Sequence, residues 1–488
     1  MNNLVKNELS KIFHKKALYI ILIILIGFIF LDCILAKVFT SGIENIIAAN
    51  ETTLQQSIDQ LDKNNPQDRD TYYSLSADLE TLKLSKKYDK NSWQRYVVTT
   101  KGKEIIEPML RSEGTDEYEF NKQKYDDFIQ KLNSNDWKIF AKEELNLVNS
   151  EIKMFELMSE EEKSLNSKNY DILKDKKKVL EARLDKDIPY GNSTSNKILD
   201  SYVESASILR EFENKDKLNQ LSYSDKVEKQ SAEASNKIYE YALNKKIDDR
   251  YTLATLNDQT ALASKADKAF ATAHSEYSLF IIIAIVFVAG TIVSEEANKG
   301  TIKLLLVRPY RRTKILLSKF LACLVVYLLV SIVVALLQFI IGGIFYGFND
   351  YVGKIILYNF NAGTVKEISS IVMLFLSWLS ILPEHIILLT LAFTISTVLN
   401  SSAFAIAVSL LGSMTSSIIN GLAFSFKKAE FLRFFVTPNW NFMGRLFGKL
   451  PMLEGMTIPF SITICLLYFA LLATLSIQVF KKRDIKNI

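Results

Sequence analysis

Cysteine is almost absent from this sequence. Its 488 residues include three cysteines, Cys33, Cys323 and Cys465, and each lies in a long apolar run. The polar stretch at residues 37–276 contains none, so disulfide bonds cannot hold it together. We expect this stretch to depend on a packed core, which suits a protein of the bacterial cell envelope.

Histidine is equally scarce, and no phosphate-binding loop occurs. The three histidines, His14, His274 and His385, lie in different regions, which leaves no His-x-x-x-His pair and no catalytic triad. The Gly-Lys pairs at 102, 353 and 448 are followed by Glu, Ile and Leu, where a phosphate loop requires Ser or Thr. We therefore expect no catalytic residue, no metal site and no cofactor in this chain.

Charge divides the chain into two kinds of sequence. Residues 37–276 carry 44 acidic and 37 basic side chains, a net charge of −7, and the other residues carry 10 and 22, a net charge of +12. The two values sum to the +5 of the whole chain. This asymmetry points to different compartments and not to a nucleic-acid partner.

Six apolar segments are long enough to cross a lipid bilayer, for which ~20 helical residues suffice. They are Ala17–Ala36, Tyr277–Ser294, Phe320–Tyr346, Ile368–Leu399, Ser401–Phe424 and Met456–Phe480. Helices buried in a soluble core seldom run this long without a polar face. No small-x-small cleavage site follows the first segment, so we expect a retained span and not a signal peptide. The predicted fold class is mainly α, a polytopic membrane protein with six transmembrane helices.

Lysine and arginine near the ends of the spans predict the orientation. Basic clusters lie at the N-terminus, after the second span and at the C-terminus, and six spans place all three on one side. The prediction is a bacterial cytoplasmic membrane protein with both termini in the cytoplasm and residues 37–276 outside the cell. Residues 427–449 are the exception, because they are also basic yet fall outside in this scheme.

The polar stretch has the composition of a helical domain. Residues 37–276 contain only four glycines and three prolines, and their apolar residues recur at three- and four-residue intervals. One piece, "SWQRYVVTTKG" at residues 92–102, is predicted to be a strand or an extended hairpin. The predicted division is 1–36 for an amphipathic helix and the first span, 37–276 for a mostly helical ectodomain, and 277–488 for five further spans.

The loop at residues 295–319 has a definite order of residues. The second span ends at Glu295 and Glu296, and Gly300 allows the backbone to turn. "TIKLLLV", residues 301–307, can form a short helix with an apolar ridge, which Pro309 ends. Spacing alone leaves two interpretations: an interfacial helix among anionic headgroups, or a knob that binds a cytoplasmic partner.

Three stretches resemble a known family. "EE…GTIKLLLVRPYRRTKILLSKF" resembles the cytoplasmic loop of bacterial ABC-2-type transporter permeases, in which acids, Gly-Thr, leucines, Pro and basic residues recur in this order. "MNNLVKNELSKIFHKK", with Val5, Leu9, Ile12 and Phe13 on one face, is similar to the elbow helix before the family's first span. "LAFTISTVLNSSAFAIAVSLL" resembles its closely spaced fourth and fifth spans. The resemblance covers 1–36 and 277–488, and the ectodomain is far larger than the first loop of simpler members.

The resemblance implies a coupling helix at Thr301–Val307 that docks on an ABC ATP-binding subunit. That separate subunit would bind ATP and Mg²⁺, because this chain has no phosphate loop. Six spans are half of a usual exporter, which implies a dimer with a second permease copy or a related permease. The residues assigned to the coupling site are Glu295, Glu296, Thr301, Ile302, Leu304, Leu305, Arg308 and Arg311.

Pro383, Glu384 and His385 lie near the middle of the fourth predicted span. An ionisable side chain at that depth costs ~2.5–3.5 kcal/mol on insertion scales. Pro383 removes a helical hydrogen bond there and frees backbone carbonyls. Two interpretations remain open: a hydrogen-bonded structural kink, and a place for Glu384 and His385 on the path of a substrate.

The resemblance makes the permease subunit of an ABC exporter the leading expectation. A large ectodomain with aromatic residues suits a peptide, such as an antimicrobial or immunity-related one, or a lipid-like molecule better than a small ion. The alternative is a membrane-anchored secretion accessory or receptor-like scaffold with no transport activity of its own. A membrane enzyme is the weakest expectation, because no nucleophile–base pair or metal pair is present.

Overall fold

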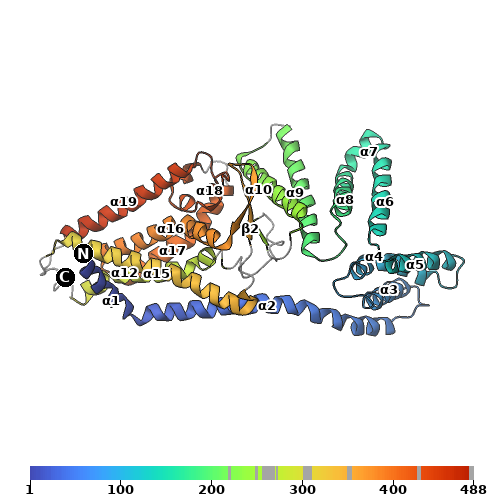
Figure 1. Ribbon diagram of the computed structural model, residues 1–488, viewed down its shortest axis with the longest axis horizontal. Helices are drawn as coiled ribbons and strands as arrows, with labels where there is room; N and C mark the ends of the chain where they lie inside the picture. The colour runs from blue at the N-terminus through green and yellow to red at the C-terminus, as the bar shows by residue number, and fades with distance from the viewer. Residues whose placement is uncertain are drawn as a thin grey trace. The chain divides into compact units, whose positions relative to one another are not determined.

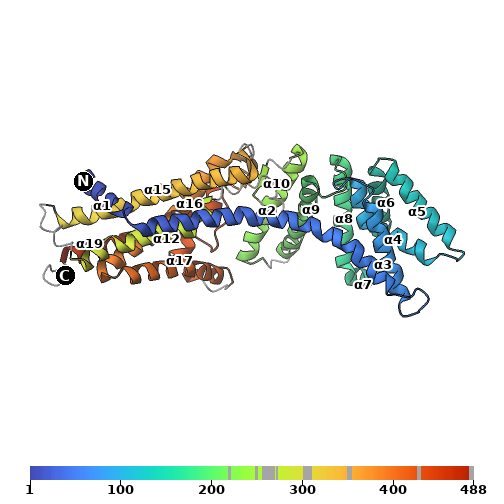
Figure 2. The same ribbon diagram turned by 90° about the horizontal axis from the view of Figure 1, so that it is seen from below.

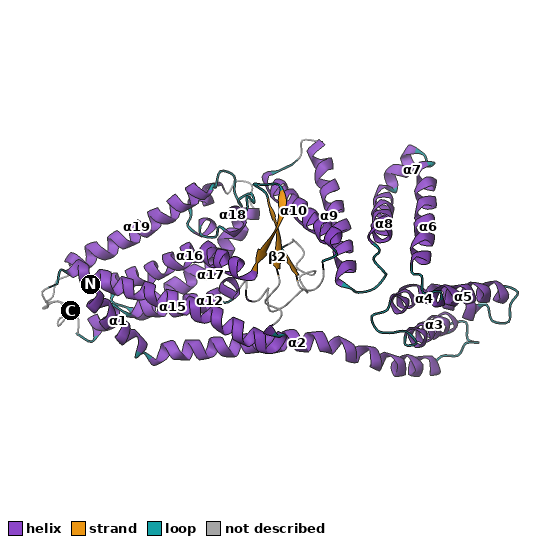
Figure 3. Cartoon of the chain, in the orientation of Figure 1, coloured by secondary structure: helices purple, strands orange, loops and turns teal. Residues whose placement is uncertain are grey.

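Helices form most of the protein, and in the part of the chain that the structure describes six of them are long and apolar enough to cross a membrane. The computed structural model describes residues 1–217, 221–247, 251–254, 270, 273–300, 310–348, 354–425 and 430–482. Figure 3 shows the strands of these described residues in one small sheet. The predicted fold class, a mainly α polytopic membrane protein, is confirmed.

The six candidate spans correspond to the six predicted apolar segments. The first covers Lys16–Leu35 within the longer helix α2, and the second covers Ser278–Asn298. The third begins earlier than predicted, because the basic residues before Phe320 are already helical. The helices that contain the spans are α2 (Lys16–Asp59), α12 (Ser278–Thr291) with α13 (Ser294–Asn298), α15 (Arg312–Tyr346), α16 (Ser370–Leu399), α17 (Ser402–Ser425) and α19 (Ile458–Lys482).

The spans pack around α12, which is apolar on every side and is therefore suited to the centre of a bundle. Its residues Ile281, Ile285 and Val288 are almost completely buried. Helix α12 contacts α15, α16 and α17, and α19 packs on α16 and α15. Figures 1 and 2 show these helices side by side.

The bundle has two ends, which we name the α1 end and the sheet end. The α1 end holds α1 (Asn2–Phe13), α13, the beginning of α15 and the end of α19, where the Arg312 guanidinium donates to the carbonyl of Lys481 at 3.0 Å. The sheet end holds the connections α15–α16 and α17–α19. The second connection contains η3 (Glu430–Phe434), η4 (Thr437–Asn439) and α18 (Met443–Leu446).

A three-stranded sheet lies at the sheet end. Strand β2 (Lys354–Asn359) pairs antiparallel with β3 (Thr364–Ser369) and parallel with β1 (Tyr251–Leu253). Gly363 has φ +64° in the β2–β3 turn, a conformation that glycine adopts readily. No strand was predicted here; residues 355–357 of β2 are all buried, so this strand is covered on both faces.

The chain divides into two compact units. One consists of Met1–Cys33, Phe212–Ala234 and Arg250–Ile488, and the other of Ile34–Glu211 and Ser235–Asp249. The predicted division into 1–36, 37–276 and 277–488 rests on membrane sidedness and stays a prediction.

The second unit has its own hydrophobic core. Its centre includes Val97, Phe128, Leu132 and Phe140, which are buried with neighbours from five helices. The helices in residues 60–245 are α3 (Arg69–Ser85), α4 (Trp93–Arg111), α5 (Tyr118–Asn133), α6 (Lys138–Glu156), α7 (Glu160–Leu165), α8 (Ser167–Lys186), α9 (Thr194–Lys217) and α10 (Tyr223–Lys245).

The strand predicted at residues 92–102 is wrong, because this segment begins helix α4. The Ser92 side chain accepts a hydrogen bond from the backbone N–H of Arg95 and caps the helix. Val97 and Val98 are completely buried on its inner face. Their β-propensity is therefore outweighed by the cap and by tertiary packing.

Because the second unit has a separate core, residues 51–211 expressed alone should be helical by circular dichroism and should melt cooperatively. In this fragment we expect Ile106→Val to lower the free energy of unfolding by about 0.5–1.5 kcal/mol, since Ile106 is buried. The matched control Ile172→Val removes the same methyl group from a side chain that is 63% exposed, and should be nearly neutral. Equal effects of the two substitutions, or a fragment without a cooperative transition, would contradict an autonomous core.

Candidate functional site

Helix α1 is amphipathic and packs on α15. Ile12 is buried, and Val5 and Leu9 pack against the hydrophobic core of the bundle. The predicted apolar face therefore contacts protein, except that Phe13 is exposed. Glu8 lies on the same face and is buried with it, so this face also brings a carboxylate into the bundle.

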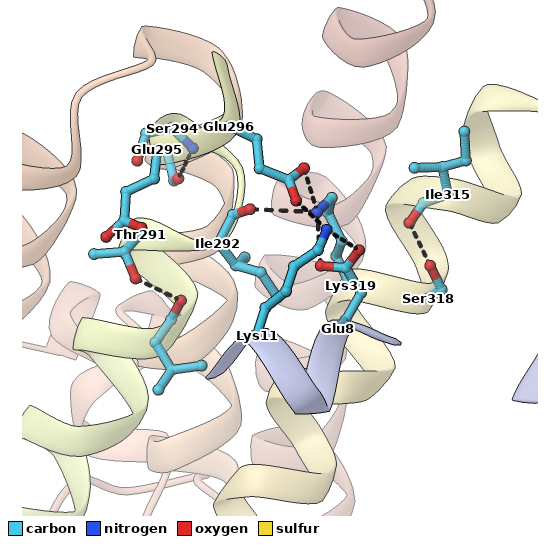
Figure 4. A network of polar contacts seen from close by, with 12 residues as sticks. Glu8, Lys11, Thr291, Ile292, Ser294, Glu295, Glu296, Ile315, Ser318 and Lys319 are labelled. Atoms are coloured by element: carbon cyan, nitrogen blue, oxygen red, sulfur yellow. Dashed lines mark hydrogen bonds and ion pairs between the residues drawn. The ribbon is translucent and has the colours of Figure 1, made fainter. Parts of the chain in front are cut away.

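Lys319, in the first turns of α15, is the centre of a buried ion network (Figure 4). Its Nζ lies 2.8 Å from Glu8 Oε2 and 2.6 Å from Glu296 Oε2, and it donates to the carbonyl of Ile292 at 3.4 Å. The Lys319 side chain is 0% exposed. A fully buried ammonium is tolerated only when it is paired and hydrogen-bonded, and these three acceptors meet that need.

Lys11 connects the same carboxylates from the side of α1. Its Nζ lies 2.6 Å from Glu296 Oε1 and 3.2 Å from Glu8 Oε1, so each oxygen of Glu296 binds a different lysine. Burial disfavours the charged form of Lys11, but Glu296 and Glu8 outweigh it and hold its pKa above the ordinary lysine value. Lys11 is therefore a permanently charged member of the network at neutral pH.

Lys15 makes a second connection between the N-terminal segment and the end of α12. Its Nζ lies 3.0 Å from Glu295 Oε2 and donates to Thr291 Oγ1 at 2.6 Å. Burial outweighs the attraction of Glu295 and lowers the pKa of Lys15. Glu295 and Glu296 thus both bind lysines that lie before the first span.

The network joins three parts of the bundle that are far apart in the sequence. Its three lysines and three carboxylates balance in charge: Lys11, Lys15, Lys319, Glu8, Glu295 and Glu296. They connect α1, the α12–α13 end of the second span and the start of the third span. In the sequence, residues 301–309, which lie outside the described residues, come between the second and third of these parts.

The residues predicted to form the coupling site fall into two groups. Glu295 and Glu296 lie at the junction, with lysines as their partners. Gly300 has φ +67°, as expected for a turn at the end of α13. Arg311 is exposed and precedes α15 in an extended conformation. Thr301, Ile302, Leu304, Leu305 and Arg308 lie outside the described residues, so their assignment stays a prediction.

Sequence reasoning missed four members of the network: Glu8, Lys11, Lys15 and Lys319. The one signal available was Glu8, a charged residue between the apolar positions of an amphipathic helix. Lys15 and Lys319 were interpreted only as basic residues that flank spans, and their partners could not be identified from the sequence.

Glu384 and His385 occupy different environments although they are adjacent. Helix α16 continues through Pro383. Glu384 is half-buried and has no hydrogen bond or ion pair among the described residues. His385 is 0% exposed; its Nε2 lies 2.9 Å from Ser278 Oγ and its Nδ1 lies 3.3 Å from the hydroxyl of Tyr327. Consecutive helical residues point ~100° apart, which explains the difference.

The bundle brings two of the chain's three histidines to the same helix. His274 Nε2 lies 3.1 Å from the carbonyl of Ser331, one helical turn beyond Tyr327 in α15. His385 contacts Tyr327 itself, with the ring centroids 5.4 Å apart. The sequence analysis assigned His274 and His385 to separate regions. Polar contacts therefore join the start of the second span, α15 and α16 inside an otherwise apolar bundle.

Comparisons with known proteins agree with a membrane protein. The family described as "Protein of unknown function (DUF2705)" matches residues 258–486. The "Uncharacterized protein YhcI" of Bacillus subtilis is 28% identical over 218 residues, which are 45% of this chain and 69% of that protein. The "Uncharacterized membrane protein YdbK" of the same organism is 29% identical over 204 residues, 41% of this chain and 76% of that protein. No solved structure matches the chain.

Proposed function

We propose that this chain is the membrane-spanning subunit of an ATP-driven ABC exporter of the ABC-2 type. A separate ATPase subunit docks on residues 301–307 and hydrolyses ATP. This chain converts the resulting movement into export of a substrate.

The ion network at the α1 end is the observation that carries the proposal. Lys319 and Lys11 both bind Glu296, and so connect α15, α1 and α13 through one carboxylate. A short helix between α13 and α15 would therefore transmit a displacement to helices that the ion network connects to one another. A displacement applied there would move the second span, the third span and α1 together, as a coupling segment requires.

The orientation that the proposal requires agrees with the positive-inside rule. The α1 end holds the basic residues of the N-terminus, of the start of α15 and of the end of α19, and all of these would face the cytoplasm and its ATPase. The balanced network uses only three of these lysines. Arg311 and Lys314 remain exposed for a partner or for anionic headgroups.

The second unit supports a peptide or a lipid-like molecule as substrate. It exposes large apolar side chains on one helix and its C-cap, with Leu147 at 66%, Met154 at 66% and Leu157 at 87% exposure. Exposed apolar groups of this size commonly mark binding surfaces. A second permease copy or a related permease would complete the transport path. In this proposal, residues 37–276 face the outside of the cell.

Copurification tests the proposal. The affinity-tagged chain, solubilised from native membranes, should carry an ATP-binding protein with it. The double substitution Leu304→Asp with Leu305→Asp should abolish this association while leaving membrane insertion intact, because an unpaired charge in an apolar socket costs several kcal/mol.

The matched control is Leu304→Met with Leu305→Met, which keeps the ridge apolar and similar in volume. It should retain the ATPase. If the parent chain carries no ATP-binding protein, the exporter proposal fails and the scaffold alternative is favoured. If the Asp variant still binds the ATPase, the coupling assignment is wrong.

A further inference from the structure

The connection between α17 and α19 carries the basic excess that the topology scheme left unexplained. Its described residues include Arg433, Arg445 and Lys449. None of these three forms an ion pair with a carboxylate in the described part of the chain, although Glu430 and Glu454 lie in the same connection. Three cations of this connection therefore have no carboxylate partner among the described residues.

Arg445 organises the connection. Its guanidinium donates to the Ser461 hydroxyl, to the carbonyl of Asn441 at 2.8 Å and to the carbonyl of Met456 at 3.4 Å. These three oxygen atoms accept hydrogen bonds from the guanidinium, but none of them carries a negative charge to balance its positive charge. Burial lowers the pKa of Arg445, as expected for a cation without a carboxylate partner.

Asn439 brings Arg433 to the same place. The Asn439 amide donates to the carbonyls of Arg433 and Phe435, both at 2.7 Å, and accepts from the Ser461 hydroxyl at 2.6 Å. Ser461 is the residue that Arg445 also binds. One buried amide thus fixes the backbone of Arg433 to the residue that holds Arg445.

The Arg433 guanidinium has unused hydrogen-bond donors. Its Nε is buried and has no acceptor among the described residues, and its centre lies 5.1 Å from the ring centroid of Phe434. A Cβ atom at position 455 would lie 3.5 Å from Arg433 NH1. Because residue 455 is glycine, no side chain occupies this space next to the guanidinium. A buried guanidinium donor without an acceptor is costly, and an external anion would remove that cost.

Lys449 is the third cation of this connection, and it lies against Gly444, the residue before Arg445. Its aliphatic chain crosses Gly444, where a Cβ would lie 3.1 Å from Lys449 Cδ. Burial lowers its pKa, and no carboxylate among the described residues opposes this effect.

The connection also has the surface of a membrane-interface segment. Phe431, Phe434 and Phe435 are 61%, 51% and 42% exposed, and they lie in and beside η3, in the connection that follows α17. Exposed phenylalanines together with basic residues are common in segments that lie at the membrane interface, where rings enter the acyl boundary and charges face phosphates.

We propose that Arg433, positioned by Asn439 and Arg445, binds the phosphate of an anionic membrane phospholipid in the leaflet at the sheet end, and that Lys449 adds positive charge on the same connection. A guanidinium presents paired donors that match two phosphate oxygens, and a lysine ammonium adds a point charge. The exposed phenylalanines favour a lipid over a soluble phosphate, because they would contact its acyl chains. This site does not depend on the exporter proposal.

The test uses the full chain, extracted in a neutral detergent and washed free of loosely held lipid. Added phosphatidylglycerol should raise its thermal unfolding temperature, and phosphatidylcholine and inorganic phosphate should not. The double variant Arg433→Gln with Lys449→Gln should bind phosphatidylglycerol about tenfold or more weakly, since charge-assisted hydrogen bonds to the phosphate are lost. Arg445 is left unchanged because it holds the fold of the connection.

Two control variants keep the result interpretable. Arg433→Lys preserves the charge but loses the paired donors, and should retain part of the stabilisation if the connection is folded. Lys366→Gln removes an exposed positive charge from β3 at the same end of the bundle and should bind lipid like the parent. Equal stabilisation by inorganic phosphate would overturn the lipid assignment. Equal phosphatidylglycerol binding by the double variant and the parent would overturn the site.

Discussion

Replacing Lys319 with methionine should lower the free energy of unfolding of the detergent-solubilised chain by about 3–5 kcal/mol, the usual cost of breaking a buried ion pair from one side. Lys319 is fully buried and is the shared partner of Glu8 and Glu296. Its loss leaves two carboxylates together in a buried site, with Lys11 as their remaining cation. The measurement is denaturant or thermal unfolding in mixed micelles.

Two further variants separate this network from a general effect of charge. Lys314→Met changes the same residue type on the same helix at an exposed position and should be nearly neutral. Combining Lys319→Met with Glu8→Met should recover much of the lost stability, because buried ion pairs can often be replaced by apolar residues of similar volume. If Lys319→Met is no more harmful than Lys314→Met, the network does not hold α1 to the bundle.

The same variants test whether the ion network also takes part in the proposed coupling of ATP hydrolysis to transport. A network that transmits movement should matter for transport even where the chain remains folded and associated with the ATPase. The double variant Lys319→Met with Glu8→Met restores stability, yet it removes the connection between α1 and α15. Reduced transport in that stable variant would support a mechanical role for the junction, whereas unchanged transport would leave it a purely structural feature.

The six spans could be predicted because length and apolarity are local properties of a sequence. A run such as Ser370–Leu399 fulfils the membrane criterion without reference to any other segment. The helical character of residues 60–245 could be predicted on the same basis, from scarce Gly and Pro and from apolar spacing. Only the segment that begins α4 was wrong, because Val97 and Val98 suit a strand locally and are buried in a helix by tertiary packing.

The ion network could not be predicted because its members are distant in the chain. Lys11 and Glu296 are 285 residues apart, and Glu8 and Lys319 are 311 apart. Each of these residues also has a simple local explanation as a polar flank of a span. Pairing depends on how the spans pack, and span packing in a bilayer is determined by side-chain complementarity that a single sequence does not display.

The sheet at residues 354–369 illustrates a different limit. Its strands are short and connect two spans, and their apolar residues resemble a continuation of the membrane segments. Their pairing with Tyr251–Leu253 depends on a partner about 100 residues earlier in the chain. The basic residues 427–449 are an exception to the positive-inside pattern. The sequence does not reveal that Arg433 and Arg445 have no carboxylate partner among the described residues, because this depends on tertiary packing.

His385 and Glu384 should respond very differently to substitution. We expect His385→Leu to lower the free energy of unfolding by about 1–3 kcal/mol, because it leaves the hydroxyls of Ser278 and Tyr327 buried without their shared partner. Glu384→Gln should be close to neutral for stability and for transport, since Glu384 has no ion pair or hydrogen bond in the described part of the chain. The measurements are unfolding in mixed micelles and export from membrane vesicles.

The substitutions at His385 and Glu384 distinguish the two interpretations that the sequence left open for α16, a structural kink and a place on the path of a substrate. A neutral imidazole donates from one ring nitrogen and accepts at the other, so His385 can bridge α12 and α15 as a structural connection. His385→Gln keeps donor and acceptor capacity and should recover part of the stability that His385→Leu loses. A Glu384→Gln variant that is stable, assembled with its ATPase and inactive would instead place that carboxyl on the transport path. Such a result would give two neighbouring residues of α16 different roles, with Glu384 acting in transport and His385 stabilising the fold.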